Sequence, residues 1–217
     1  MRFERKYIFN EYSIDNIKNR IKSLGFKCAF PSRQVNSIYY DSNDYYLYNI
    51  SEAGISDRTK IRIRWYNFND EKQLEYKIKQ AEIGKKTNYK NLKEDSNFLP
   101  LEFNLPSNIL KTKINIPQII DQVFSPKVCI TYKRDYFISN SESTRITLDY
   151  KINYSRVIKT IDHYRLSNYF PAENAVMELK YDYLSNNSLL IDRVVNNLSA
   201  QITRFSKYCQ AIKLIYN

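Results

Sequence analysis

Four segments of the sequence place polar, mostly charged side chains at every second position, with basic residues in the majority. They are residues 60–65, 75–79, 145–150 and 177–181. Successive side chains of an extended strand point to opposite faces, so each segment would form a strand with one charged and one apolar face. Arginine offers paired N–H donors to phosphate oxygens, lysine offers a compact positive charge, and the few carboxylates could hold a divalent cation. The first function that these residues indicate is therefore chemistry on a phosphate compound.

Two arrangements of the strands would account for the charged faces. In the first, the apolar faces form a core and the charged faces meet water, as charged faces usually do. In the second, the sheet closes into a barrel whose polar lumen is lined by arginine and lysine, and helices and loops cover the apolar outside. Like charges crowded in such a lumen repel one another, so only a polyanionic ligand would offset their cost. The repetition in four separate segments weakens the first arrangement.

The composition excludes several classes of protein. The chain has 217 residues and a net charge of +11, from 34 Lys+Arg against 23 Asp+Glu, which favours phosphate compounds, nucleic acid or an acidic membrane surface as partners. Only three glycines are present, so the glycine-rich phosphate loop of Rossmann and P-loop enzymes is ruled out and side chains must bind any phosphate. One histidine and three widely spaced cysteines leave histidine triads, zinc sites and disulfide frameworks without their parts.

The length and the hydropathy of the chain predict its organisation and location. A chain of 217 residues can build one substantial core, so we expect a single domain over residues 1–217. The N-terminus does not resemble a signal peptide, and no apolar run is long enough to cross a membrane. We therefore expect a cytoplasmic protein.

Helices are expected at the ends of the chain and strands between them, which is an α+β fold. Residues 13–24 read as a helix that Ser13 caps and Gly25 ends. Helical periodicity returns from Ser188 onward. About eight strands are expected, the clearest being residues 35–40, 60–66, 74–79, 128–137, 145–150, 156–161 and 175–181. Residues 85–94 are polar and read as a loop, and residues 101–124 read as mixed, with broken helical pieces.

Eight short motifs, taken together and in order, resemble the VTC domain. This family is the polyphosphate polymerase branch of the triphosphate tunnel metalloenzymes, whose other large branch is called CYTH. The motifs are residues 3–7, 37–42, 60–66, 75–79, 132–136, 145–149, 178–181 and 204–208. The last of them contains the Ser-Lys-Tyr sequence that is among the family's more specific signals. The resemblance implies a closed antiparallel β-barrel of about eight strands that forms a basic tunnel, with flanking helices.

The resemblance also implies roles for individual residues. The expected catalytic residues, which would bind the reacting phosphates, are Lys6, Arg62, Arg64, Lys77, Arg134 and Lys180. Further phosphate contacts are expected from Lys60, Lys79, Arg145, Ser206 and Lys207. The cofactor would be Mn2+ or Mg2+, held by Glu178, with Glu4, Glu75 and Asp149 as secondary candidates.

One departure from the CYTH pattern bears on the reaction. Tunnel triphosphatases of that branch begin with Glu-x-Glu-x-Lys, whereas here Arg2 occupies the first glutamate position and Glu4 and Lys6 keep the rest. Hydrolysis needs a held and activated water, which extra carboxylates assist. Chain extension needs none, because the attacking oxygen is already a phosphate anion. The sequence therefore predicts a metal-dependent polyphosphate polymerase that transfers the γ-phosphate of ATP to a growing polyphosphate chain.

Other functions stay open at this point. An inorganic or RNA 5′-triphosphatase could use the same fold, and so could a protein that binds polyphosphate or nucleic acid without turning it over. The expected partners are ATP and inorganic polyphosphate; no specific nucleic acid is expected, because the tyrosines lie mostly on apolar faces. Eukaryotic relatives work in membrane assemblies, and since this chain has no membrane span, such coupling would need a membrane-protein partner. The sequence does not define the oligomeric state.

Overall fold

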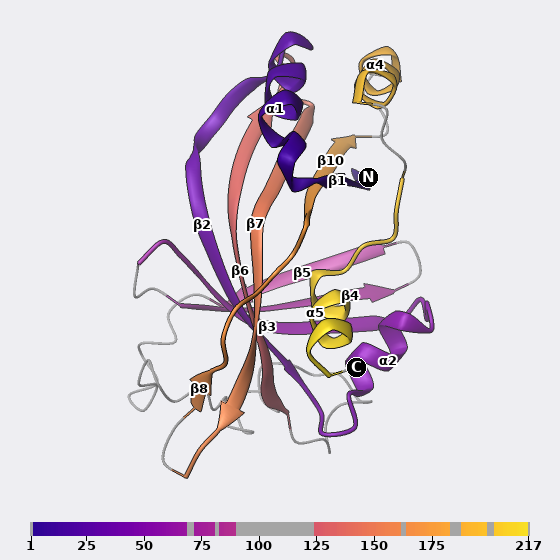
Figure 1. The fold of residues 1–217 in the computed structure, drawn as a ribbon. Coiled ribbons are helices and arrows are strands. Elements are labelled where there is room, and N and C mark those ends of the chain that lie inside the picture. Colours follow the sequence, from indigo (N-terminus) through magenta and orange to yellow (C-terminus); the bar gives the residue numbers. More distant parts are fainter. Residues whose placement is uncertain are drawn as a thin grey trace. The chain divides into compact units, whose positions relative to one another are not determined.

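The computed structural model describes residues 2–68, 72–80, 83–89, 124–161, 164–182, 188–198 and 202–216. They form an α+β fold built on an antiparallel β-sheet (Figure 1). The strands are β1 (Arg2–Asn10), β2 (Lys27–Asp41), β3 (Arg58–Tyr66), β4 (Gln73–Gln80), β5 (Ile83–Tyr89), β6 (Ser125–Ile138), β7 (Thr144–Lys159), β8 (Tyr164–Leu166), β9 (Phe170–Pro171) and β10 (Asn174–Asp182). The helices are the 3-10 turn η1 (Glu11–Ser13), α1 (Ile14–Ser23), α2 (Tyr46–Glu52), α4 (Ser188–Leu198) and α5 (Lys207–Tyr216).

The contacts within the chain group it into two compact units, each made of three segments. Unit 1 comprises Met1–Gln34, Thr131–Asn153 and Pro171–Ser206. Unit 2 comprises Val35–Ile130, Tyr154–Phe170 and Lys207–Asn217. Hydrogen bonds connect the strands in the order β1-β10-β7-β6-β2-β3-β4-β5, with β8 and β9 paired to β7. The strands β2, β6 and β7 each contribute residues to both units.

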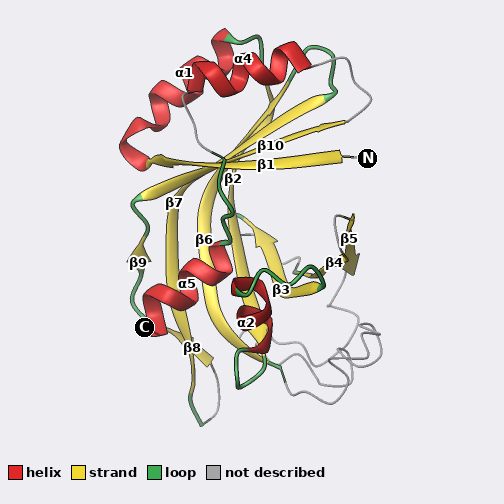
Figure 2. Ribbon diagram, turned by 90° about the vertical axis from the view of Figure 1, so that its right-hand side faces the viewer, coloured by secondary structure: helices red, strands yellow, loops and turns green. Residues whose placement is uncertain are grey.

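The core of unit 1 lies between the strands and the helices α1 and α4. Figure 2 shows these two helices side by side across β1 and β10. The apolar faces of β7 and β10 meet the helices there, through Ile146, Leu148, Met177 and Leu179, all of which are buried. The predicted apolar faces of these two strands are therefore confirmed.

The first helix forms where its apolar spacing predicts it. Ile14, Ile17 and Ile21 are buried on one face of α1. The prediction that Ser13 caps it is wrong, since the Ser13 hydroxyl donates instead to the carbonyl oxygen of Asn10 at 2.6 Å. Gly25 follows the helix with a φ of 89°, the left-handed conformation that favours glycine at this place.

The core of unit 2 lies between β2, β3 and β4 and the helix α2. Ile61 and Ile63 of β3 are fully buried beside Ile38 of β2 and Leu47 of α2. The other face of β3 carries Lys60, Arg62 and Arg64, as the alternation predicts. Helix α5 packs against α2, and Figure 2 shows the two lying next to one another.

Several predicted elements need correction. Residues 85–94 do not begin as a loop, because β5 continues to Tyr89 and pairs with β4 in an antiparallel hairpin. The two strands expected at residues 145–150 and 156–161 are one strand, β7, which passes through Lys151 at a φ of 51°. The prediction for residues 101–124 falls outside the described residues except for Phe124. Among the described helices, none is both long and apolar enough to cross a membrane.

Candidate functional site

The charged faces of the strands hold side chains that are buried from water. The exposed fraction is 5% for Arg64 and 2% for both Glu75 and Asp149. Burying a charge is costly unless it is paired and hydrogen-bonded. These faces are therefore not ordinary solvated surfaces, and each unit places its own set of paired charges on them.

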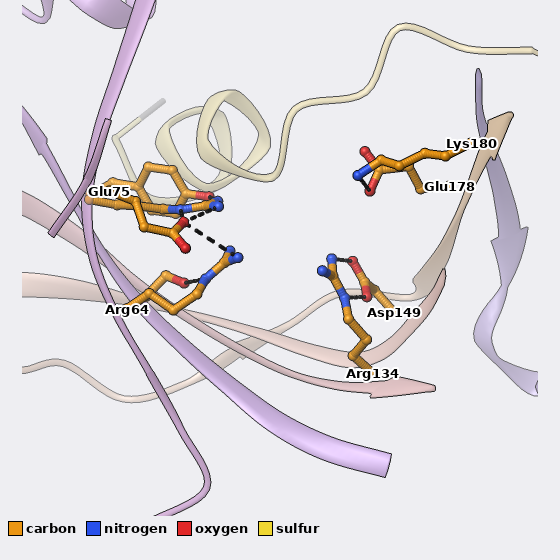
Figure 3. A network of polar contacts seen from close by, with 9 residues as sticks. Arg64, Glu75, Arg134, Asp149, Glu178 and Lys180 are labelled. Carbon is orange, nitrogen blue, oxygen red and sulfur yellow. Dashed lines mark hydrogen bonds and ion pairs between the residues drawn. The ribbon is translucent and has the colours of Figure 1, made fainter. Parts of the chain in front are cut away.

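In unit 2 the charges centre on Glu75 of β4. Its side chain lies directly across the strand pair from Arg62 and accepts from the Arg62 guanidinium, with Oε2 at 2.7 Å from Nε and 2.5 Å from Nη2. Nη1 of Arg64 lies 3.6 Å from the same oxygen, and Nε of Arg64 donates to the Ser37 hydroxyl at 3.1 Å (Figure 3). The Glu75 carboxylate thus holds two guanidinium groups in fixed positions. Glu75, expected from the resemblance as a secondary metal ligand, is therefore paired with arginines.

The lysines of unit 2 face one another across the strands. Lys60 of β3 is paired in register with Lys77 of β4, and Lys77 is paired with Lys86 of β5. Lys79, whose backbone lies in β4, is opposite Arg58. Like charges directly opposite one another destabilise a sheet, so Lys60 opposite Lys77 indicates a place where an anion is expected.

Tyr39 of β2 is a residue of this cluster that the sequence did not indicate. Its hydroxyl accepts from Nη1 of Arg62 at 2.7 Å, and its exposed fraction is 6%. Burial raises the pKa of the Tyr39 phenol, but the charges of Arg62, Arg64 and Lys60 more than offset this and lower the pKa to about 8. The lowered pKa of this phenol follows from the three positive charges around it.

The Ser-Lys-Tyr motif lies at the beginning of α5. Ser206 directly precedes the helix, and Lys207 is its first residue; both are half-buried. Tyr208, the next residue, stacks on Tyr39 with ring centroids 5.3 Å apart and donates its hydroxyl to the Asp41 carboxylate at 2.5 Å. In this motif Tyr208 anchors helix α5, and Ser206 and Lys207 lie at the N-terminus of the helix, the end that favours anions.

In unit 1 the charges centre on Glu178 of β10. Glu178 Oε2 lies 3.4 Å from Lys180 Nζ, and Lys180 also reaches Glu4 of β1 at 3.7 Å. Lys6 lies 3.6 Å from Glu4 and donates to the carbonyl oxygen of Phe205 at 3.1 Å. The antiparallel pairing of β1 with β10 produces this arrangement, since it places Lys6 opposite Glu178 and Glu4 opposite Lys180.

The ionisation of Glu178 follows from these neighbours. Burial raises the pKa of its carboxyl group, but the interaction with the Glu4 side chain and the positive charges of Lys180, Lys6 and Arg134 outweigh burial and hold the pKa well below its usual range. Glu178 is therefore a carboxylate at neutral pH, which is the form that binds a cation.

Arg134 and Arg145 complete the set of predicted residues in this unit. Arg134 of β6 makes a bidentate pair with Asp149, with Nε 2.5 Å from Oδ1 and Nη2 2.7 Å from Oδ2 (Figure 3). Burial lowers the pKa of Arg134, but Asp149 above all, with Tyr132 and Glu178, raises it well above its usual value. Arg145 is exposed and is paired in register with Lys180, a second case of like charges opposite one another.

The residues around Glu178 fit a divalent cation in their chemistry. The carboxylates of Glu4 and Glu178 both lie within 4 Å of the Lys180 ammonium group, at 3.7 and 3.4 Å, and carboxylate oxygens are ligands that Mg2+ and Mn2+ prefer. In the described part of the chain no three His, Cys, Asp or Glu residues gather into one group, so water or phosphate oxygens would complete the coordination. The hydroxyl of Thr147, which is opposite Glu178 in the register, is buried with no hydrogen-bond partner among the described residues.

The orphaned hydroxyl of Thr147 gives a testable effect on stability. Thr147→Val keeps the shape of the side chain and removes a buried polar group that has no partner, so the free energy of unfolding of the ligand-free protein is expected to rise by about 1 kcal/mol. Thermal denaturation measures it. Thr147→Ser, the control, keeps the hydroxyl and loses a methyl group, and it should lower the stability by about 1 kcal/mol. A valine variant less stable than wild type would contradict this reading of the hydroxyl.

The comparison with known families agrees with the geometry. A sequence model of the VTC domain matches residues 1–216. The chain belongs to the VTC domain family. The resemblance of the eight motifs to that family is therefore confirmed. No curated protein matches this VTC domain.

Solved structures share the fold of this VTC domain. It is similar to an adenylate cyclase candidate from Bacillus halodurans, with a TM-score of 0.57, 15% identity and coverage of 100% of this chain and 98% of that one. A second such candidate, from Vibrio parahaemolyticus, has a TM-score of 0.54, 14% identity and coverage of 98% and 97%. A third, an adenylyl cyclase candidate from Hippeastrum described as having a dominant triphosphatase activity, has a TM-score of 0.56, 11% identity and coverage of 98% and 96%. At these identities the likeness establishes the fold alone.

Proposed function

We propose that this VTC domain is a polyphosphate polymerase that transfers the γ-phosphoryl group of ATP to the end of an inorganic polyphosphate chain. The observation that carries the proposal is the placing of like charges opposite one another on both units, Lys60 against Lys77 and Arg145 against Lys180. A sheet gains no stability from such pairs. A polyanion with a negative charge on every phosphate group would offset their repulsion along its length.

The unit 2 residues are proposed to bind phosphate groups. Arg62 and Arg64, fixed by Glu75, would donate N–H groups to phosphate oxygens, for which arginine is suited. Lys60 and Lys77, with Lys79 and Lys207, would supply point charges along the chain. Ser206, the last residue of unit 1, would donate its hydroxyl to a phosphate oxygen. Prior orientation of the guanidinium groups lowers the entropic cost of binding.

The unit 1 residues are proposed to hold the metal and the reacting phosphates. Glu178 and Glu4 would bind Mn2+ or Mg2+, while Lys6, Lys180, Arg134 and Arg145 bind phosphate oxygens. A bound divalent cation would neutralise charge on phosphate oxygens. The Lys180 ammonium group lies 3.4 Å from Glu178 and 3.7 Å from Glu4. With a cation held by the two glutamates, this ammonium group would bind a phosphate oxygen instead.

The proposed reaction needs no nucleophile from the protein. An oxygen of the terminal phosphate of polyphosphate attacks the γ-phosphorus of ATP, the bond from that phosphorus to the β,γ-bridging oxygen breaks, and ADP leaves with the electron pair. The basic side chains position the two phosphates and stabilise the charge that develops on them. Arg2 at the place of a first glutamate leaves one carboxylate fewer for water activation, which supports transfer over hydrolysis.

A triphosphatase is the second candidate function. The activity ascribed to the Hippeastrum protein, whose fold this chain shares, favours it. The same residues would then act on tripolyphosphate or an RNA 5′-triphosphate, with water in place of the polyphosphate end.

One incubation separates these functions. Purified protein is mixed with ATP and Mn2+ or Mg2+, with and without a short polyphosphate primer, and chain length is read on a gel while ADP and free phosphate are measured. Growth of the chain with one ADP released per added phosphate is expected. Free phosphate without growth would identify a triphosphatase, and binding of polyphosphate with neither product would identify a binding protein.

Four further predictions concern the assembly of the molecule and its place in the cell. We propose that the sheet closes into a tunnel and that the two units act as one domain over residues 1–217. Both would be tested by a crystal structure with bound tripolyphosphate. A cytoplasmic location and a membrane-protein partner likewise stay predictions, for which localisation of a tagged chain and affinity purification are the tests.

A further inference from the structure

Tyr39 and Tyr208 form a stacked aromatic pair beside Arg62, and neither of them is among the proposed phosphate-binding residues. We propose that Tyr39, held by Tyr208, is a positioning residue that fixes the Arg62 guanidinium for phosphate binding. Arg62 is held at two places, by Glu75 through Nε and Nη2 and by the Tyr39 hydroxyl through Nη1. The inference rests on the proposed function, which makes Arg62 a residue that contacts phosphate.

Tyr39 itself cannot move away from Arg62 easily. The Tyr208 ring lies nearly parallel to it, at 13°, and Tyr208 is anchored by its hydroxyl bond to buried Asp41. Asp41 in turn accepts from the backbone N–H groups of Ser42, Leu47 and Tyr48 at 2.8 to 2.9 Å. The orientation of Arg62 is thus connected, through two tyrosines, to a carboxylate that also binds the first turn of α2.

This arrangement matters because a free arginine side chain is flexible. Ordering such a side chain on binding costs conformational entropy, and this cost is smaller for a group that is already held in position. Glu75 alone fixes one edge of the guanidinium, and the Tyr39 hydroxyl fixes the remaining Nη group. Without that hydroxyl the guanidinium could turn toward Glu75 and away from a phosphate.

The charges around Tyr39 provide a signature of its contact with Arg62. The titratable groups that act on it or stack on it are Arg62, Arg64 and Lys60 of β3, Tyr208 of α5 and Tyr154 of β7. As the pH rises through the Tyr39 pKa of about 8, the phenolate adds a negative charge beside Arg62, and affinity for a polyanion falls. Conversely, a bound polyanion offsets the positive charges and raises the pKa of Tyr39.

The experiment compares Tyr39→Phe with wild type in the binding of tripolyphosphate and Mg2+ by calorimetry. Near neutral pH the variant, which keeps the ring and loses the hydroxyl, is expected to bind about tenfold more weakly, an effect typical of one hydrogen bond to a charged group. Above the Tyr39 pKa the difference should shrink, because only wild type loses affinity there. Tyr40→Phe, a buried tyrosine on the opposite face of β2, is the matched control and should bind like wild type.

Tyrosinate absorbance supplies a second readout that a purely structural role would not change. Wild type should have a titration step near the Tyr39 pKa of about 8 that Tyr39→Phe lacks, and tripolyphosphate should move this step to higher pH. Equal affinity of the variant near neutral pH, or a step that the ligand does not move, would overturn the inference. If the variant does not fold, the titration of wild type with and without tripolyphosphate decides alone.

The same measurements separate this inference from the proposed function. If wild type binds tripolyphosphate and Tyr39→Phe binds it equally well, the positioning role fails and the function stands. If wild type binds no tripolyphosphate, both are overturned.

Discussion

Replacing Glu178 with glutamine is expected to abolish metal-dependent turnover while leaving the protein folded. The carboxylate is half-buried beside Lys6, Lys180 and Arg134 and stays ionised, and glutamine fills the same space without the charge that a divalent cation needs. Replacing a residue that only supports a metal ligand typically lowers metal affinity or activity about 10- to 100-fold. Replacing the proposed ligand itself should therefore lower activity by about 100-fold or more. Calorimetry with Mn2+ and tripolyphosphate should lose its metal dependence in parallel.

The pH dependence of stability gives this variant an independent check. A carboxyl group whose pKa is depressed by folding stabilises the folded state above its unfolded pKa of about 4.3, and that contribution is lost as the pH falls toward the folded pKa. Metal-free Glu178→Gln should therefore be less stable than wild type at neutral pH, and the difference should shrink in acid. Glu173→Gln, an exposed glutamate of the same unit, is the control. Undiminished turnover in Glu178→Gln would remove Glu178 as metal ligand.

Arg64→Ala is expected to reduce turnover by about 100- to 1,000-fold, the cost typical of losing one pre-positioned charge donor. The side chain is buried between Ser37 and Glu75, so no other group replaces it. The stability should fall by less than the roughly 3–5 kcal/mol that removing one partner of a buried ion pair costs, because Arg62 remains bound to Glu75. Turnover assays and thermal denaturation of the same preparation measure the two effects.

Two companion variants make the result specific. Arg64→Lys keeps the charge but not the planar, paired donors, and it should recover only part of the activity. Arg165→Ala removes an exposed arginine of β8 in the same unit and should leave turnover unchanged. Loss of activity in both alanine variants would point to net charge, and an Arg64→Ala protein that does not fold would indicate a structural arginine.

The strands that carry the candidate site could be predicted because two constraints agree there. In β3 the alternation of Ile61 and Ile63 with Lys60, Arg62 and Arg64 satisfies both strand geometry and the burial of one face. Alternation alone predicts which side chains share a face. It does not predict that Glu75 joins two arginines, since that pairing depends on the register between β3 and β4.

Two of the elements that were not predicted, α2 and β5, have no such local signal. Helix α2 has Tyr45 at its N-cap, with a φ of 57° and no capping bond from its side chain, and its first turn is bound instead by Asp41 at the end of β2. Strand β5 has no apolar alternation, and its pairing with β4 supplies the hydrogen bonds that define it. In both cases distant contacts decide the structure, and propensity gives way to them.

The pairing of β1 with β10 has a consequence for the synthesis and folding of the chain. Glu4 and Lys180 face one another from strands that lie at opposite ends of the sequence, so the loop between them must close before the carboxylate pair exists. Contacts of such long range slow folding. During synthesis on the ribosome, the cationic segments of β3 and β4 emerge well before Glu178 does, so the growing chain presents positive charge to the cell's polyanions before Glu4 and Glu178, the carboxylates proposed to bind the metal, can come together.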